Sequence, residues 1–71
     1  MKQFDVTVAW DPAARVWWGR NDELPLTTEA ATLDEFEARA VEIAQEMAEI
    51  NGFAAPGERV KIRIIKEPVS P

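Results

Sequence analysis

The chain contains no cysteine, no histidine and no tyrosine, and its only serine is Ser70, the residue before the last. Disulfide bonds, thiolate nucleophiles, imidazole catalysis and zinc sites with sulfur or imidazole ligands are therefore excluded. Adjacent carboxylates such as Asp22-Glu23 and Asp34-Glu35 do not by themselves converge on one metal ion. We predict that the protein is not an enzyme and that it uses no cofactor and no metal ion.

Long apolar runs are also missing. No segment approaches the roughly 20 apolar residues of a membrane-spanning helix, and the N-terminus lacks the apolar stretch of a signal peptide. We expect a cytoplasmic protein with no membrane partner. The 71 residues predict a single domain, residues 1–71, with one small core, and such short domains are often stabilised by association with other chains. The net charge of −5 disfavours nucleic acid as a partner and favours a basic protein.

The segment 32–50 has the pattern of one complete amphipathic helix. Thr32 is a suitable N-cap, Glu35 lies three residues later as a capping box requires, and Asn51-Gly52 supplies a left-handed C-cap. Apolar residues recur at spacings of three and four, which predicts one buried helical face. That face comprises Leu33, Phe36, Ala40, Ile43, Ala44, Met47 and Ile50.

Four segments have the pattern of strands: residues 1–10, 15–20, 26–30 and 58–67. Prolines at Asp11-Pro12 and Leu24-Pro25 mark connections, because proline fixes φ and donates no ladder hydrogen bond. Lys61, Arg63 and Ile65 alternate to the outer side of the last strand. The strand residues predicted to face the helix are Phe4, Val6, Val8, Val60, Ile62 and Ile64.

The register of the first hairpin has two solutions. Trp17 and Trp18 point to opposite faces, because neighbouring residues of a strand alternate. Val8 lies opposite Trp18 if the loop has five residues, and opposite Trp17 if it has four. We favour Trp18 and Val16 facing the core. One tryptophan is then left exposed or is covered by another subunit.

The elements follow one another in the order β-β-β-α-β, which predicts an α+β fold. Hairpin connections run the first three strands up, down and up, and a right-handed crossover through the helix returns the fourth strand parallel to the third. The prediction is one mixed four-stranded sheet with a single helix packed on one face. Nothing in the chain covers the opposite face.

Glutamates gather on the helix face opposite the apolar one. One interpretation of this acidic stripe is a surface that docks a basic partner protein. The plainer alternative is a solvated helix face with ion pairs to Arg39. The partner-docking candidates are Glu35, Glu42, Glu46 and Glu49.

The candidates for a subunit interface are Trp17, Trp18, Ile65 and Arg63. Tryptophan is enriched both in cores and in interfaces, so a core position is the alternative for the two tryptophans. For the basic residues of the last strand, the alternative to a binding role is a protective one. Outward-facing charge prevents an exposed strand edge from pairing with other chains.

The sequence resembles the HicB-like superfamily and, more closely, the small bacterial families of unknown function within that group. The resemblance covers nearly the whole chain, through short motifs. The residues that carry it are Val8-Ala9-Trp10-Asp11-Pro12, Val16-Trp17, Asp22-Glu23-Leu24-Pro25 and Thr28-Glu29-Ala30-Ala31-Thr32-Leu33-Asp34-Glu35.

This resemblance implies a truncated ribonuclease-H-like β-β-β-α-β fold. In the antitoxin members of the group, a domain of this kind neutralises HicA, a small basic ribonuclease toxin, and a separate module binds DNA. The chain departs from that pattern in two places. It shows no helix-turn-helix or ribbon-helix-helix segment, and Pro25-Leu26-Thr27 stands where the group usually has Pro-Gly and then an apolar or cysteine residue. We therefore carry over neither DNA binding nor individual toxin-binding residues.

These observations favour a protein-binding module that self-associates as a dimer or tetramer and that neutralises a small basic toxin in the manner of an antitoxin. One alternative is a degenerate ribonuclease-H-like nuclease that uses Asp5 and helix carboxylates with magnesium. The other is a weak nucleic-acid-binding protein that uses Arg59, Lys61, Arg63 and Trp17.

Overall fold

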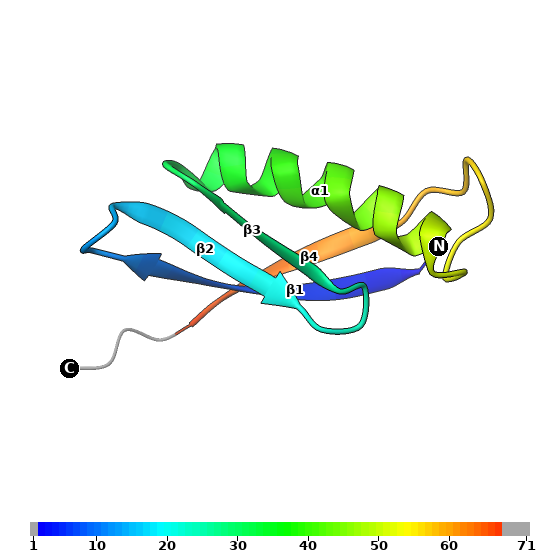
Figure 1. The fold of residues 1–71 in the computed structure, drawn as a ribbon, viewed down its shortest axis with the longest axis horizontal. Helices are drawn as coiled ribbons and strands as arrows, with labels where there is room; N and C mark the ends of the chain where they lie inside the picture. The colour runs from blue at the N-terminus through cyan, green and yellow to red at the C-terminus, as the bar shows by residue number, and fades with distance from the viewer. Residues whose placement is uncertain (1, 68–71) are drawn as a thin grey trace.

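The computed structural model describes residues 2–67. Within them, the elements follow in the order β1 (Gln3–Asp11), β2 (Val16–Asn21), β3 (Leu26–Ala30), α1 (Leu33–Ile50) and β4 (Lys61–Lys66). The strands form one mixed sheet with the order β3-β2-β1-β4, and α1 lies across one face of it (Figure 1). The predicted α+β fold with the order β-β-β-α-β is confirmed.

The fourth strand lies at the edge of the sheet, beside β1. It is parallel to β1, whereas β1 with β2 and β2 with β3 are antiparallel. The strand therefore runs in the same direction as β3, as predicted, although the two occupy opposite edges. The chain passes from one edge to the other through α1, which contacts β2, β3 and β4. Residues 2–67 place no second layer on the other face.

The predicted element bounds differ from the structure mainly in the last strand. The bounds of β3 are as predicted, and α1 begins directly after its N-cap Thr32. The predicted strand 58–67 is shortened to Lys61–Lys66, because the segment before it is held by the helix. The amide of Gln45 donates to the carbonyl of Glu58 at 2.6 Å and accepts from the N–H of Val60 at 3.1 Å.

The turn between β1 and β2 is built on the side chain of Asp11. Its Oδ1 accepts hydrogen bonds from the N–H groups of Ala13 and Ala14, and its carbonyl accepts from the N–H of Arg15. Arg15 has φ of 57°, the left-handed conformation that brings the chain back into the sheet. As a result β1 continues through Asp11, which pairs with Val16.

This turn sets a register that the sequence reading did not consider. Val8 pairs with Gly19 and Trp10 with Trp17, so both predicted partners of Val8 were wrong. Trp17 therefore lies on the helix side of the sheet, where it packs against the core. The prediction that Trp18 and Val16 face the core was also wrong, because Trp18 lies on the opposite side and is 40% exposed.

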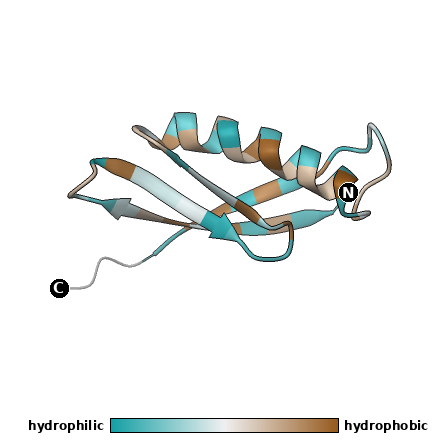
Figure 2. Ribbon diagram, in the orientation of Figure 1, coloured by the Kyte–Doolittle hydropathy of each residue, from teal (hydrophilic) through white to brown (hydrophobic). Residues whose placement is uncertain are grey.

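The core lies between α1 and the sheet. Apolar and polar residues alternate along β1 and the first part of β4 (Figure 2), and the apolar ones are the buried or half-buried residues of these strands. Val60, Ile62 and Ile64 line this layer as half-buried residues, as predicted. The fully buried residues are Phe4, Val6, Val8, Leu24, Leu26, Ala30, Phe36, Ala40, Ala44, Ala48 and Ala54.

The buried face of α1 differs from the prediction at its C-terminal end. Ile50 was expected inside and is 68% exposed, whereas Ala48 is fully buried. The buried residues Phe36, Ala40, Ala44 and Ala48 are four apart, so the stripe advances by about 40° at each step. At the end of the helix the stripe has therefore turned away from Ile50, which lies about 200° from Ala48.

Among the described residues, no helix is long and apolar enough to cross a membrane.

Gly19 provides the space in which the helix meets the sheet. It is buried in β2, opposite Val8, and a Cβ built on it would lie 2.7 Å from Cζ of Phe36 and 2.4 Å from the carbonyl oxygen of Thr7. Carbon atoms in ordinary contact are about 3.5–4.0 Å apart. No larger residue fits here unless the Phe36 ring and the neighbouring strand move.

Leu24 is a core residue supplied by a segment that reads as a polar loop. Its N–H donates to Oδ1 of Asn21 at 3.0 Å, and its carbonyl accepts from Nδ2 of Asn51 at 2.8 Å. The two asparagines hold the loop against the end of α1, which turns the Leu24 side chain inward. Because Leu24 follows three polar residues and precedes a proline, its pattern gives no sign of this burial.

We predict that Gly19→Ala lowers the free energy of unfolding by about 2–3 kcal/mol, as overpacking of a filled core does. The added methyl group collides with the Phe36 ring and with strand β1. Urea unfolding followed by tryptophan fluorescence measures the loss.

Gly52→Ala is the matched control. Gly52 has φ of 77°, and a Cβ added to it would have no atom within 4 Å, so the change introduces only backbone strain, about 1 kcal/mol. A loss at Gly19 no larger than the loss at Gly52 would contradict the role given to the contact with Phe36.

Candidate protein-interaction site

The side of the sheet away from α1, called here the open face, is the candidate functional site. Its members follow from the strand register, because residues that alternate with the buried ones point to this side. The open face consists of Gln3, Asp5, Thr7, Ala9 and Asp11 of β1, Val16, Trp18 and Arg20 of β2, Thr27 and Glu29 of β3, and Lys61, Arg63 and Ile65 of β4.

The centre of the open face is apolar. Trp18 lies beside Ala9 of the neighbouring strand, and Ile65 lies beside Thr7. Trp18 is 40% exposed and Ile65 37% exposed, so these large side chains are only half covered by the chain. An antiparallel sheet with one solvated face normally carries polar residues there. A tryptophan and an isoleucine at the centre of such a face are typical of a protein interface.

One ion pair spans two strands of the open face. Arg63 of β4 donates from Nε to Oδ1 of Asp5 at 3.1 Å and from Nη2 to Oδ2 at 3.0 Å. The two residues are partners in the ladder between β1 and β4. This two-bond geometry fixes the planes of both groups and orients Arg63 along the sheet. Both side chains remain accessible to solvent, so they are also available to a partner.

The interface candidates divide between the two sides of the sheet. Trp18, Ile65 and Arg63 share the open face, whereas Trp17 lies on the helix side. Trp17 contacts Trp10 with ring centroids 5.3 Å apart, and Nζ of Lys66 lies 5.9 Å from its ring. The sequence could not show which of the two tryptophans faces the helix, because that depends on the hairpin register.

A shallow apolar hollow of about 530 Å³ lies on the helix side, near the start of α1. Trp10 and Trp17 form one part of its lining, and Ala31, Thr32 and Leu33 form the other. Sequence reasoning missed this hollow, since it joins the end of the β1–β2 hairpin to the first turn of the helix. The pairing of Trp10 with Trp17 is the feature that creates it.

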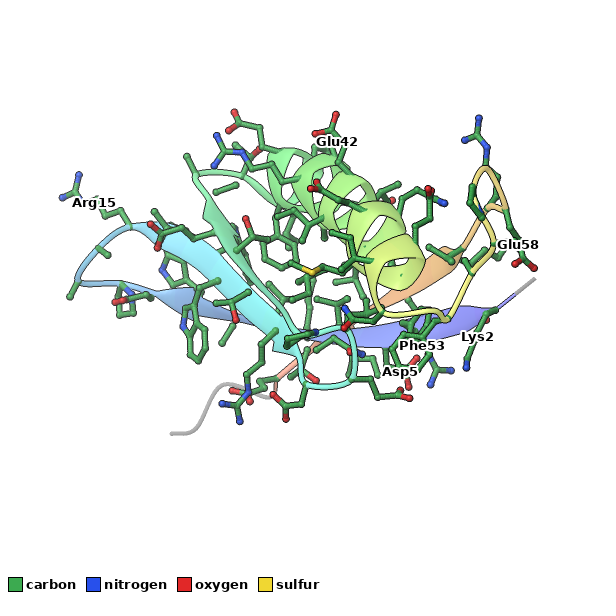
Figure 3. The ribbon with its side chains drawn as sticks, turned by 45° about the vertical axis from the view of Figure 1, so that its right-hand side comes forward. Lys2, Asp5, Arg15, Glu42, Phe53 and Glu58 are labelled. Carbon is green, nitrogen blue, oxygen red and sulfur yellow. The ribbon has the colours of Figure 1, made fainter. Side chains whose placement is uncertain are left out.

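The partner-docking candidates Glu35, Glu42, Glu46 and Glu49 are all exposed on the outer side of α1. Glu42 projects away from the sheet, whereas Asp5 lies on its far side (Figure 3). Arg39 donates to the carbonyl of Glu29 at 2.8 Å. In the described part of the chain, the pair of Arg63 with Asp5 is the one ion pair, so the helix glutamates form none of the expected pairs with Arg39.

The residues of the nuclease alternative are not brought together. Asp5 lies on the open face and is bonded to Arg63, while the helix carboxylates lie beyond the opposite side of the sheet. Over residues 2–67, no group of three or more acidic side chains is close enough to hold a metal ion. The nucleic-acid alternative is divided in the same way, since Trp17 and Lys61 occupy opposite faces.

Comparison with known proteins agrees with this fold. The crystal structure of a hypothetical protein from the extremely thermophilic bacterium Thermus thermophilus is 35% identical to the chain and superposes with a TM-score of 0.78. The match covers 97% of this chain and 99% of the other. No curated protein matches the chain.

The family comparison matches residues 3–70, nearly the whole length, to the domain of unknown function DUF1902. The predicted resemblance to a family of unknown function is confirmed, because DUF1902 is such a family. The match does not extend to the HicB-like superfamily, which remains a prediction from the sequence motifs. The chain belongs to the DUF1902 family.

Proposed function

We propose that this chain is a protein-binding module that self-associates through the open face of its sheet. The observation that supports this proposal is the half-exposed pair Trp18 and Ile65 at the centre of a sheet face that residues 2–67 leave uncovered. Tryptophan contributes strongly to binding where an interface excludes water around it. A second protein surface on the open face would exclude that water.

The size of the core favours the same function. The buried residues form a single layer between one helix and one face of the sheet. A chain this short buries a small share of its surface when it folds alone, so association adds apolar burial that its own length does not supply. The open face is the natural place for this burial, because its apolar centre adjoins the same strands that carry the core.

A basic protein partner on α1 is the second candidate function. The exposed Glu42 and Glu46 stand on the outer side of the helix, and no bond to a basic side chain within residues 2–67 neutralises them. Self-association through the open face leaves this side of the molecule free. The HicB-like motifs in the sequence support an antitoxin-like role, in which the partner is a small basic toxin.

We predict that Trp18→Glu dissociates the oligomer without unfolding the chain, because it places a charge at the centre of the interface. Sedimentation velocity on the purified protein should show loss of the oligomer, with the dissociation constant raised at least tenfold. Circular dichroism should show an unchanged fold.

Trp10→Glu is the matched control. Trp10 is 42% exposed, close to the exposure of Trp18, but it lies on the helix side of the sheet. It should leave the mass of the particle unchanged. A wild-type chain that stays monomeric at all concentrations, or an oligomer that survives Trp18→Glu, would refute the proposed function.

For the second candidate we predict that the double variant Glu42→Gln and Glu46→Gln loses a small basic protein that the wild-type chain captures from its native cell lysate. Removal of two charges weakens attraction to a basic surface at least tenfold when several ion pairs form. Mass spectrometry of the captured material identifies the partner.

The control for this experiment removes the same charge elsewhere, through Asp22→Asn and Glu23→Gln in the exposed loop before β3. It should retain the partner. Recovery of the chain's own copies alone would exclude the basic partner and leave the self-association proposal intact.

A further inference from the structure

We infer that a second copy packs on the open face with its strands antiparallel to those of the first. The two copies are related by a two-fold axis that lies between the two sheets and runs perpendicular to the strands. This inference rests on the proposed self-association and gives it a geometry. It is drawn from the distribution of charge along the open face, where basic and acidic residues occupy separate halves.

The first half of the open face, toward the start of β1 and β4, is basic. It carries Lys61, Arg63 and Arg20; of the acids there, Asp5 is bonded to Arg63, and the exposed Asp22 follows the end of β2. Lys61 pairs with Gln3 in the ladder, and Arg20 pairs with Thr7 and Thr27, so neither has an acid directly beside it.

The second half of the open face, toward the end of β1, is acidic. Glu29 lies beside Trp18 at the edge of β3, and Asp11 pairs with Val16. Glu67 follows β4, and its N–H donates to the carbonyl of Val8, so that its exposed side chain continues the alternation of that strand on the open face. No basic residue of residues 2–67 falls in this half of the face.

The apolar residues lie on the boundary between the two halves. Ile65 stands in the same cross-strand row as Thr7 and Arg20, and Trp18 stands in the next row with Ala9 and Glu29. A two-fold axis that crosses the strands between these rows lays each row of one copy on the other row of the second, so that the apolar residues of both copies lie within two adjoining rows. It also places the acidic half of each copy on the basic half of the other.

The alternative symmetry is electrostatically unfavourable. A two-fold axis parallel to the strands would place the acidic half on the acidic half and the basic half on the basic half. Like charges that face one another across an interface are strongly disfavoured, and complementary ones fix the register. Packed sheets keep their strands within about 30° of a common line, which the antiparallel arrangement permits.

The nearest charges across the axis are Glu29 and Arg20. They lie in the two rows next to the axis and on neighbouring strands, β3 and β2. In the antiparallel arrangement, Arg20 of the second copy lies over the Trp18 ring of the first, and Glu29 of the first lies diagonally across from that arginine, on the neighbouring strand. An arginine over a tryptophan face and beside a carboxylate is a favourable combination. Each contact occurs twice, because the axis is two-fold.

Two single charge reversals and their mixture test this contact between chains. Arg20→Glu places two acids in contact in its own dimer, and Glu29→Arg places two arginines in contact. Each variant alone should self-associate at least tenfold more weakly than the wild-type chain. In the equimolar mixture, every contact between the two kinds of chain joins an arginine to a glutamate. The mixture should therefore form a heterodimer with near wild-type affinity, measured by sedimentation and identified by native mass spectrometry.

Glu42→Arg on the outer side of α1 makes the same change of charge as Glu29→Arg, and it should not alter self-association. Circular dichroism of each variant confirms that the chain is folded. The inference is overturned if either single reversal associates like the wild type, or if the mixture binds no better than its components. If Trp18→Glu dissociates the oligomer while both reversals leave it intact, self-association stands and only the antiparallel geometry fails. A monomeric wild-type chain would overturn both.

Discussion

The ring of Phe36 packs against the backbone of β2 at Gly19, and the position of the helix depends on this contact. A side chain at Gly19 would occupy the space of the ring and would push α1 away from the sheet. The alanines that follow Phe36 at intervals of four continue the close approach along the helix. The core of residues 2–67 therefore lies between a single helix and one face of a single sheet. Residues 2–67 leave the other side of the sheet open.

A second constraint is the turn at Asp11, which determines what the open side carries. The Asp11 carboxylate bonds to the N–H groups of the turn, and β1 therefore extends by one residue beyond its predicted end at Trp10, as far as the aspartate-proline break. A shift of one residue exchanges the faces of a strand. Trp17 is accordingly placed against the core and Trp18 on the open face, together with Ile65.

The two sides of the molecule have different electrostatic character. The outer side of α1 carries glutamates that form no ion pair within residues 2–67, which suits a basic partner and repels a second copy of itself. The open face carries both signs in separate halves around an apolar centre, which suits an identical surface turned end to end. The two proposed partners would therefore occupy different surfaces, and the occupation of one would leave the other accessible.

The elements and their order could be predicted from local signals in the chain. The helix bounds, its cap at Thr32, the inward residues of β1 and the uncovered side of the sheet all follow from local signals: periodicity, caps and prolines. Only the tertiary structure decided the hairpin register, the burial of Leu24 and the exposure of Ile50. Each of these depends on contacts between segments distant in the chain, or on a side chain that bonds to a turn. The face of Trp18, and with it the proposed interface, could not be read from spacing alone, because more than one loop length fits the same pattern and the observed register accompanies the bonds that Asp11 makes within the turn.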